Sequence, residues 1–310
     1  EREYTPLAEN FGGEIIHVST SSKNHINPMD INTNYSDKDE PTKLKSEFIL
    51  SLCECIIGGS SGLSAKERTI IDRCVDKTYT KFMQDLDDKK MPTLLDFQNM
   101  LEAQPEEEAR SIALELELYT RGSLSAFAKK TNINMNKRLV VFDIKDLGKQ
   151  LKTMGMLIVL DAVWNRITQN RIIGKTTWIY IDEIYLLFAN GYSANFLFEL
   201  YKRARKWGGI PTGITQNVED LLSSDLARSM LSNSEFTMML NQAPLDRAEL
   251  AKLFSLSDTQ IEYISNAETG QGLLRAGNNI IPFRDEFPSN TKLYQMMTTK
   301  PEEMIKTAAN

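Results

Sequence analysis

From residue 137 to residue 283, short apolar runs alternate with longer segments in which apolar residues recur at three- and four-residue steps. The short runs have the length and the β-branched content of strands, and the longer segments have the period of helices. Strands that alternate with helices along a chain form a mainly parallel sheet with helices on both faces. The sequence therefore predicts an α/β fold.

The expected strands in this alternation, with one earlier strand, are residues 14–19, 138–144, 177–181, 210–215 and 235–240; the expected helices are residues 147–168, 193–207, 220–231, 244–254 and 258–265. The run 138–144 is almost continuously apolar, which is typical of a strand buried on both faces. Gly208 and Gly209 give the backbone the freedom that a helix needs to end. Residues 271–276 and 279–283 are expected to close the domain as a hairpin.

A different pattern covers residues 42–118, where helical periodicity continues without a β-rich run. Ser64 with Glu67, and Thr93 with Asp96, have the spacing of capping boxes at helix starts. We interpret this stretch as an all-helical insertion. Its glutamate-rich end is typical of a solvated helix face. The predicted organisation is a core formed by residues 1–36 and 136–288, an insertion at 37–135 and a C-terminal helical tail at 289–310.

Charge and hydropathy limit the classes of partner. The 310 residues carry a net charge of −6, which argues against a generally basic nucleic-acid-binding protein but leaves room for a local basic patch. Acidic residues interrupt the longest apolar runs before they reach the ~20 residues of a membrane span. An odd number of cysteines, three, fits a reducing compartment. The chain opens on Glu1 without an apolar leader, so we expect an internal fragment without a signal peptide.

The sharpest local signal is an acidic doublet that follows an apolar strand. Residues 177–181 lead directly into Asp182 and Glu183, at the strand end where open α/β sheets bind their ligands. One acid in this position can hold Mg²⁺, directly or through water, and its neighbour can deprotonate an attacking water. This is the Walker B pattern of P-loop ATPases. The alternative is an ordinary polar turn after a strand.

A second signal follows the next strand, which ends in Gly213-Ile214-Thr215-Gln216. If the two strands are neighbours, the amide of Gln216 lies beside the acidic doublet. It can then bond both a γ-phosphate oxygen and the attacking water, as a sensor of hydrolysis does. A helix cap or turn residue is the alternative for Gln216.

Between the two signals, four cations lie close to the end of a predicted helix, in the run Lys202–Lys206. Cations at a helix C-terminus complement the helix dipole, and this would be a sufficient reason for the cluster. In a ring of subunits, an arginine of this run could instead reach the phosphates of a neighbouring subunit. Such an arginine finger contributes ~10³–10⁵ in rate.

Taken in this order, these motifs resemble the additional ATPase of conjugative type IV secretion systems, the VirB-four-like group of the RecA-like hexameric pumps. The resemblance spans nearly the whole chain. The segments that carry it are EREYTPLAENFGGEIIHVS at the start, Tyr119–Leu124 through Phe127, VVFDI, YIDE, RKWGG, the TQ pair, Gly270–Leu273 and Phe287-Pro288. The fold that it implies is a RecA-like α/β core with an all-α insertion.

The resemblance also implies roles for single residues. Asp182 would bind Mg²⁺ and ATP, holding the metal through water, and Glu183 would be the catalytic acid. Gln216 would sense the γ-phosphate. Arg205 would be the finger that acts on a neighbouring subunit, with Arg203 as the second choice. ATP and Mg²⁺ are the cofactors implied.

The implied assembly is a homo-hexamer on the cytoplasmic face of the cell membrane. Its implied partners are other secretion components, namely the coupling ATPase and inner-membrane channel proteins.

One element of the family pattern is missing, the phosphate-binding loop G-x-x-x-x-G-K-S/T. Gly174-Lys175-Thr176 has the final triplet, but Gln169 stands where the first glycine belongs, and the triplet leads into a strand instead of a helix. The glycine-rich stretch 58–62 lacks the lysine. The family places its loop upstream of the EREY segment, so we expect the chain to begin just after it. These 310 residues alone are expected to bind ATP weakly or not at all, because the loop is the main phosphate site.

The function expected from these observations is that of an ATP-hydrolysing motor which energises assembly of a secretion channel or pilus, or transfer of a substrate. One alternative is a catalytically silent module that docks on other secretion proteins through its helical insertion and C-terminal helices. Another is a DNA translocase of the same superfamily. The acidic net charge weighs against it, because DNA affinity depends on clustered cations.

Overall fold

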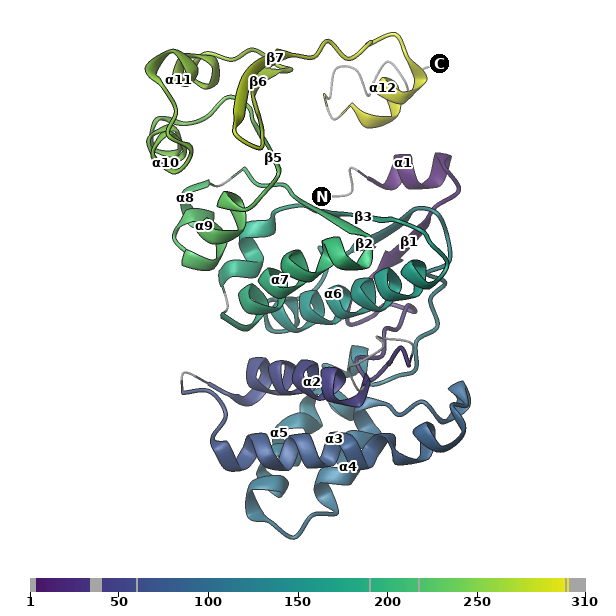
Figure 1. The fold of residues 1–310 in the computed structure, drawn as a ribbon. Coiled ribbons are helices and arrows are strands. Elements are labelled where there is room, and N and C mark those ends of the chain that lie inside the picture. The colour runs from purple at the N-terminus through teal and green to yellow at the C-terminus, as the bar shows by residue number, and fades with distance from the viewer. Residues whose placement is uncertain are drawn as a thin grey trace. The chain divides into compact units, whose positions relative to one another are not determined.

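The computed structural model describes residues 4–33, 41–59, 61–189, 191–216, 218–298 and 300. The chain forms two compact units, Glu1–Thr177 with Arg203–Ile210, and Trp178–Lys202 with Pro211–Asn310. Parts of the predicted domain boundaries, the opening residues 1–3 and the end of the C-terminal tail lie outside the described residues. The elements of both units are drawn in Figure 1.

The first unit begins with a small parallel sheet. Helix α1 (Thr5–Asn10) precedes strand β1 (Glu14–His17), which pairs in parallel with β2 (Val140–Asp143), from Glu14 opposite Val140 to His17 opposite Asp143. The strand predicted at 138–144 is therefore present, but its four paired residues are half-buried and not fully covered. A 3₁₀ turn (Ser125–Phe127) and the long helix α6 (Lys149–Ile172) complete this part.

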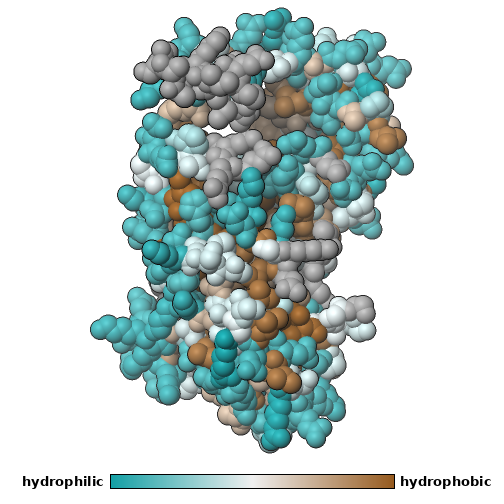
Figure 2. Space-filling model, turned by 180° about the vertical axis from the view of Figure 1, so that it is seen from behind, coloured by the Kyte–Doolittle hydropathy of each residue, from teal (hydrophilic) through white to brown (hydrophobic). Residues whose placement is uncertain are grey.

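The helices predicted between residues 42 and 118 are present in the same unit. They comprise α2 (Pro41–Ile57), α3 (Ala65–Asp85), a 3₁₀ turn (Asp88–Lys90), α4 (Leu94–Glu102) and α5 (Glu107–Thr120), which form one group of helices in Figure 1. Both predicted capping boxes form, at Ser64 and at Thr93. On the face shown in Figure 2, the surface of these helices is mostly hydrophilic, with smaller hydrophobic patches between the polar side chains.

A buried ion pair joins the insertion to α6. The Lys45 ammonium on α2 donates to Asp161 Oδ2 on α6 at 2.6 Å, and the two side chains are only 4% and 7% exposed. Lys45 also donates to the carbonyl of Pro28 at 3.2 Å. Burial raises the pKa of Asp161, and the charge of Lys45 works against that increase. Burial also raises the pKa of the nearby Asp30.

The second unit carries most of the predicted strand–helix alternation. Three elements run across the division between the units: β3 (Thr177–Ile181), α7 (Gly191–Ala204) and β4 (Gly209–Gly213). The 3₁₀ turn η4 (Arg205–Trp207), between α7 and β4, belongs to the first unit. The elements that lie wholly in the second unit are a 3₁₀ helix η3 (Ile184–Ala189), α8 (Val218–Leu222), α9 (Asp225–Ser232), β5 (Phe236–Met239), α10 (Pro244–Phe254), α11 (Asp258–Ser265), β6 (Gln271–Ala276), β7 (Asn279–Arg284) and α12 (Lys292–Met297). Strands β3 and β4 are neighbours in one sheet. The predicted glycine stop is confirmed, because Gly208 ends η4 in the left-handed conformation.

Two details of this unit differ from the sequence prediction. The helix expected at 220–231 is divided into α8 and α9, because Ser224 accepts a hydrogen bond from the Ala227 N–H and starts a new helix. Strand β5 pairs antiparallel with β6 and not as a further parallel strand, so β5, β6 and β7 form an antiparallel sheet of their own. One face of this sheet, with Met239 and Leu273, packs on Leu222, Leu250 and Ile264 of the neighbouring helices.

No helix in the described ranges is both long enough and apolar enough to cross a lipid bilayer.

Candidate functional site

The candidate site lies where β3 and β4 end side by side. Two backbone hydrogen bonds join the strand ends: Ile214 N–H donates to the Ile181 carbonyl at 2.9 Å, and Ile184 N–H donates to the Ile214 carbonyl at 3.0 Å. The turn formed by Asp182 and Glu183 is therefore held against the segment that leads to Gln216. The sequence analysis placed Gln216 beside the acidic doublet on the condition that the two strands are neighbours, and this condition is met.

The backbone of the acidic turn is in an uncommon conformation. Glu183 has a φ of +50°, in the left-handed region that side chains other than Gly, Asn and Asp rarely adopt. Its N–H is held by the preceding carboxylate, because it donates to Asp182 Oδ1 at 3.0 Å. Such a conformation costs on the order of 1–3 kcal/mol and is concentrated at functional sites. In this turn Glu183 is half-buried, while Asp182 is exposed.

Close packing beneath the turn explains the glycine at the end of β4. A Cβ atom at Gly213 would lie 2.6 Å from Ile184 Cδ1 and 3.0 Å from the Tyr201 hydroxyl. Any larger residue would therefore push against η3, the element that follows the acidic turn. The Tyr201 hydroxyl is buried and has no hydrogen-bond partner among the described residues. Burial raises the pKa of Tyr201, so this hydroxyl stays protonated.

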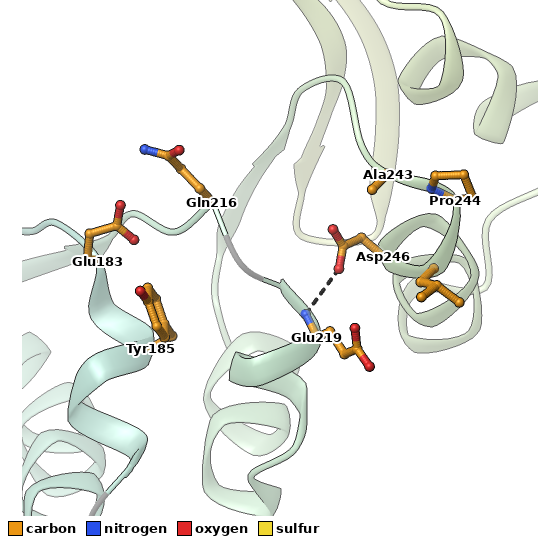
Figure 3. Close-up of a pocket in the computed structure, with 8 residues that line it drawn as sticks. Glu183, Tyr185, Gln216, Glu219, Ala243, Pro244 and Asp246 are labelled. Carbon is orange, nitrogen blue, oxygen red and sulfur yellow. Dashed lines mark hydrogen bonds between the residues drawn. The ribbon is translucent and has the colours of Figure 1, made fainter.

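A pocket of about 590 Å³ opens beside the strand ends, and its lining includes two of the predicted site residues, Glu183 and Gln216. Glu183, Gln216 and Tyr185 lie on one side of it, and the start of α10 lies on the other (Figure 3). The complete lining is Glu183, Tyr185, Gln216, Glu219, Ala243, Pro244, Leu245 and Asp246. Asp182 adjoins this pocket through the turn but is not part of its lining.

The lining includes residues that the sequence did not single out. Asp246, in the first turn of α10, accepts a hydrogen bond from the Glu219 backbone N–H at 3.1 Å (Figure 3). It thereby ties α10 to Glu219 in the first turn of α8, three residues after Gln216. In the sequence, Asp246 has the signal of an ordinary acidic residue near a helix N-terminus, and nothing local indicates its contact with α8.

Arg203 and Arg205 are not among the residues that line the pocket. Both are exposed and belong to the first unit, Arg203 in the last turn of α7 and Arg205 at the start of η4. Arg205 precedes β4, whereas Gln216 follows it. Their assignment as arginine fingers stays a prediction.

The charge of the pocket determines which ligand groups it can accept. The lining that the described residues provide has three carboxylates, on Glu183, Glu219 and Asp246, and no cationic side chain. A phosphate chain is repelled there unless cations accompany it. Mg²⁺ suits such a site, because it binds with substrate phosphates through one or two carboxylates and keeps several waters. No cluster of three or more His, Cys, Asp or Glu side chains that could hold a metal occurs in the described ranges.

Solved structures with a similar fold are known. VirB4 of Thermoanaerobacter pseudethanolicus matches with a TM-score of 0.80 and 22% identity, over 98% of this chain and 81% of that one. The bacterial conjugative coupling protein TrwBΔN70, in its trigonal form with sulphate, matches with a TM-score of 0.52 and 12% identity, over 90% and 75%. These matches confirm the predicted RecA-like fold. No significant relative is found among the curated proteins.

The similar structures show the fold, and comparison of the sequence with known families identifies the family. The profile of the TraG P-loop domain matches residues 108–281, which is more than half of the chain and runs from α5 to β7. The matched region includes the acidic doublet, Gln216 and the whole pocket. It agrees with the resemblance to the VirB-four-like ATPases that the sequence motifs indicated. The chain belongs to the TraG P-loop domain family.

Proposed function

We propose that the chain is the ATP-hydrolysing motor domain of a conjugative type IV secretion system, and that it energises channel or pilus assembly or substrate transfer. The observation that carries the proposal is the placement of Glu183 and Gln216 on one side of a single pocket at the ends of two neighbouring strands. The family of P-loop proteins and the fold shared with VirB4 support it.

Each residue of the site has a distinct role in this proposal. Asp182 would hold Mg²⁺ through a water molecule. Glu183 orients the attacking water and accepts its proton, which its position on the pocket wall permits. The Gln216 amide donates to a γ-phosphate oxygen and accepts from the same water. When bound, Mg²⁺ supplies positive charge that stabilises the transition state of phosphoryl transfer.

The site needs cations that its described lining lacks. Three carboxylates face the space, and the 310 residues contain no G-x-x-x-x-G-K-S/T motif. The proposal therefore assigns the β- and γ-phosphates to a phosphate-binding loop outside these residues, and assigns Arg205, or else Arg203, to the site of a neighbouring subunit. A homo-hexamer on the cytoplasmic face of the membrane, in contact with the coupling ATPase and channel proteins, is the assembly that fits these assignments.

The test of the proposed function is ATP turnover by the polypeptide as its cell makes it. We expect release of phosphate from ATP that requires Mg²⁺ and stops when the metal is chelated. A preparation that is folded and oligomeric but binds no ATP and releases no phosphate would reject the motor and leave the silent docking module.

A further inference from the structure

A second cavity, of about 240 Å³, lies within the first unit. Its walls come from three segments: residues 26–32, which follow β1, residues 131–136, which precede β2, and one face of α6 between residues 161 and 169. The first segment leads from β1 toward α2, and the second leads from α5 back to β2. The cavity therefore lies where the chain enters and leaves the group of helices α2 to α5, and it shares no residue with the pocket at the ends of β3 and β4.

The two loop segments of this cavity are joined to each other by hydrogen bonds. Thr131 Oγ1 accepts from the Asn27 N–H at 2.8 Å and donates to Asp30 Oδ2 at 2.5 Å. The buried Asn27 amide donates to Asp30 Oδ1 at 2.9 Å. The half-buried Asp30 carboxylate is therefore fixed in the cavity wall by contacts within the fold.

The lining also contains acceptor oxygens that receive no hydrogen bond. Asp161 is only 5% exposed, and its Oδ2 accepts from Lys45 at 2.6 Å and from Asn165 Nδ2 at 3.3 Å. Nothing in the described part of the chain donates to Asp161 Oδ1. Asn165 Oδ1 is buried and has no partner among the described residues either, while its Nδ2 also donates to the Asp30 carbonyl at 3.3 Å. Since buried acceptors are almost always paired, this end of the cavity lacks donors.

The charge at this end of the cavity is negative. Asp30 and Asp161 share one buried ammonium, that of Lys45, which lowers the pKa of both carboxyls against the effect of burial. Arg166 also lines the cavity, but its guanidinium donates to Asn136 Oδ1 at 2.8 Å. It forms no ion pair with either carboxylate in the described ranges. One negative charge is therefore left without a cation of its own.

We propose that this cavity binds an aliphatic primary amine in its protonated form. The ammonium donates to the Asp30 carboxylate and to Asp161 Oδ1, and the carbon chain lies against the apolar part of the lining. An ammonium has three donors and no acceptor, which matches what this end lacks, and its hydrogen bonds to carboxylates are charge-assisted. The apolar side chains of the lining are Ile26, Ile31, Ile133, Met135 and Ala162.

Other small occupants fit the cavity less well. Water would satisfy the oxygens but would leave the charge unbalanced. A metal ion would balance the charge but would make no use of the apolar side chains that form much of the lining. The inference depends on the first unit alone and is independent of ATP hydrolysis.

The test is isothermal titration calorimetry of the full chain with putrescine and with butylamine, near neutral pH and at constant ionic strength. We expect saturable binding of both amines. Tetramethylammonium has the charge but no N–H donor and should not bind. Nα-acetyl-lysine amide carries the same ammonium on a protein-like backbone, and we expect it to bind more weakly than putrescine.

Two variants remove the proposed contacts. Asp30→Asn keeps the shape of the side chain but removes its charge, and it should weaken amine binding about tenfold or more, as loss of a hydrogen bond to a charged group does. Ala162→Leu fills the cavity from α6 and should prevent binding. Matched controls in the same unit are Asp72→Asn, at an aspartate that also accepts from a hydroxyl, that of Ser46, and Ala103→Leu, at an exposed alanine after α4. Both controls should bind as the parent chain does.

Hydrogen exchange of the parent chain gives a second measurement that requires no variant to fold. Putrescine should slow exchange in residues 26–32 and 131–136 and leave α3 unchanged. Thermal melting of each variant separates loss of binding from loss of folding.

Several outcomes would overturn the inference. One is that neither amine binds, or that tetramethylammonium binds equally well, which would mean simple screening of charge. Another is that the control variants lose binding to the same extent as Asp30→Asn. Displacement of the amine by K⁺ or Mg²⁺ alone would make the cavity a metal site. Tighter binding of the lysine amide than of putrescine would assign the cavity to a lysine side chain of another protein and not to a free amine.

Discussion

Replacing Glu183 by Gln is expected to reduce ATP turnover of the polypeptide as its cell makes it by about 10²–10⁴-fold, the contribution typical of a general base. Gln has the size and shape of Glu but cannot accept the proton of the attacking water. The turn should survive the change, because the hydrogen bond that holds it runs from the Glu183 backbone N–H to Asp182. Nucleotide affinity should therefore stay close to that of the parent protein. Phosphate release and equilibrium binding of ATP, measured on one preparation, check both parts.

Glu219 gives a matched control in the same pocket. It is an exposed glutamate of the lining, on α8, and its side chain has no role in the proposed chemistry. Glu219→Gln removes the same charge from the pocket and should leave turnover within a few-fold of the parent value. If Glu183→Gln hydrolyses ATP at the parent rate, Glu183 has no part in catalysis. If both variants lose activity equally, the net charge of the pocket matters and not a base at Glu183.

Replacing Lys45 by Met is expected to lower the free energy of unfolding by about 3–5 kcal/mol, the cost of leaving one member of a buried ion pair without its partner. Met fills much of the same volume but leaves the Asp161 carboxylate with no cation in a site where both side chains are almost fully buried. Since Lys45 opposes the increase in the pKa of Asp161, its loss raises that pKa further. An acid whose folded-state pKa is raised loses stability as the pH rises through it, so the deficit should grow with pH. Urea denaturation at several pH values measures this.

The exposed pair Lys66–Glu108 is the control, with its ion pair at 3.1 Å and the Lys66 side chain 79% exposed. Lys66→Met should change stability far less, because water solvates both charges. Adding Asp161→Asn to Lys45→Met removes the buried charge and should recover part of the loss. A Lys45→Met protein as stable as the parent would mean that the ion pair does not hold α2 on α6.

Elements with a local signal were predictable from the sequence. The bounds of α10 and α11 are confirmed as predicted, because Pro244 and the Ser257 cap mark their starts within the sequence itself. The capping boxes at Ser64 and Thr93 are local in the same way. The partner of β5 was not predictable, because an antiparallel or parallel partner is chosen by residues far along the chain. The sequence shows only that residues 235–240 suit a strand.

In the candidate site, too, the residues with a local sequence signal were predictable and the others were not. Glu183 and Gln216 could be placed together, because each follows a strand directly and neighbouring strands end at one edge. Asp246 could not be placed in the site from the sequence, because its hydrogen bond with the Glu219 backbone N–H depends on how α10 packs against α8. Asp161 is a similar case. In the sequence it only interrupts an apolar run, and its ion pair with Lys45 spans 116 positions of the chain.

The most direct test of the central claim is a cryo-EM map of the polypeptide as its cell makes it, with Mg²⁺, ADP and aluminium fluoride bound. The account predicts that the fluoride complex, which stands in for the transferred phosphate, lies between the Glu183 carboxylate and the Gln216 amide, with Mg²⁺ on the Asp182 side. Nucleotide density in another part of the molecule, with Glu183 and Gln216 facing bulk water, would contradict it.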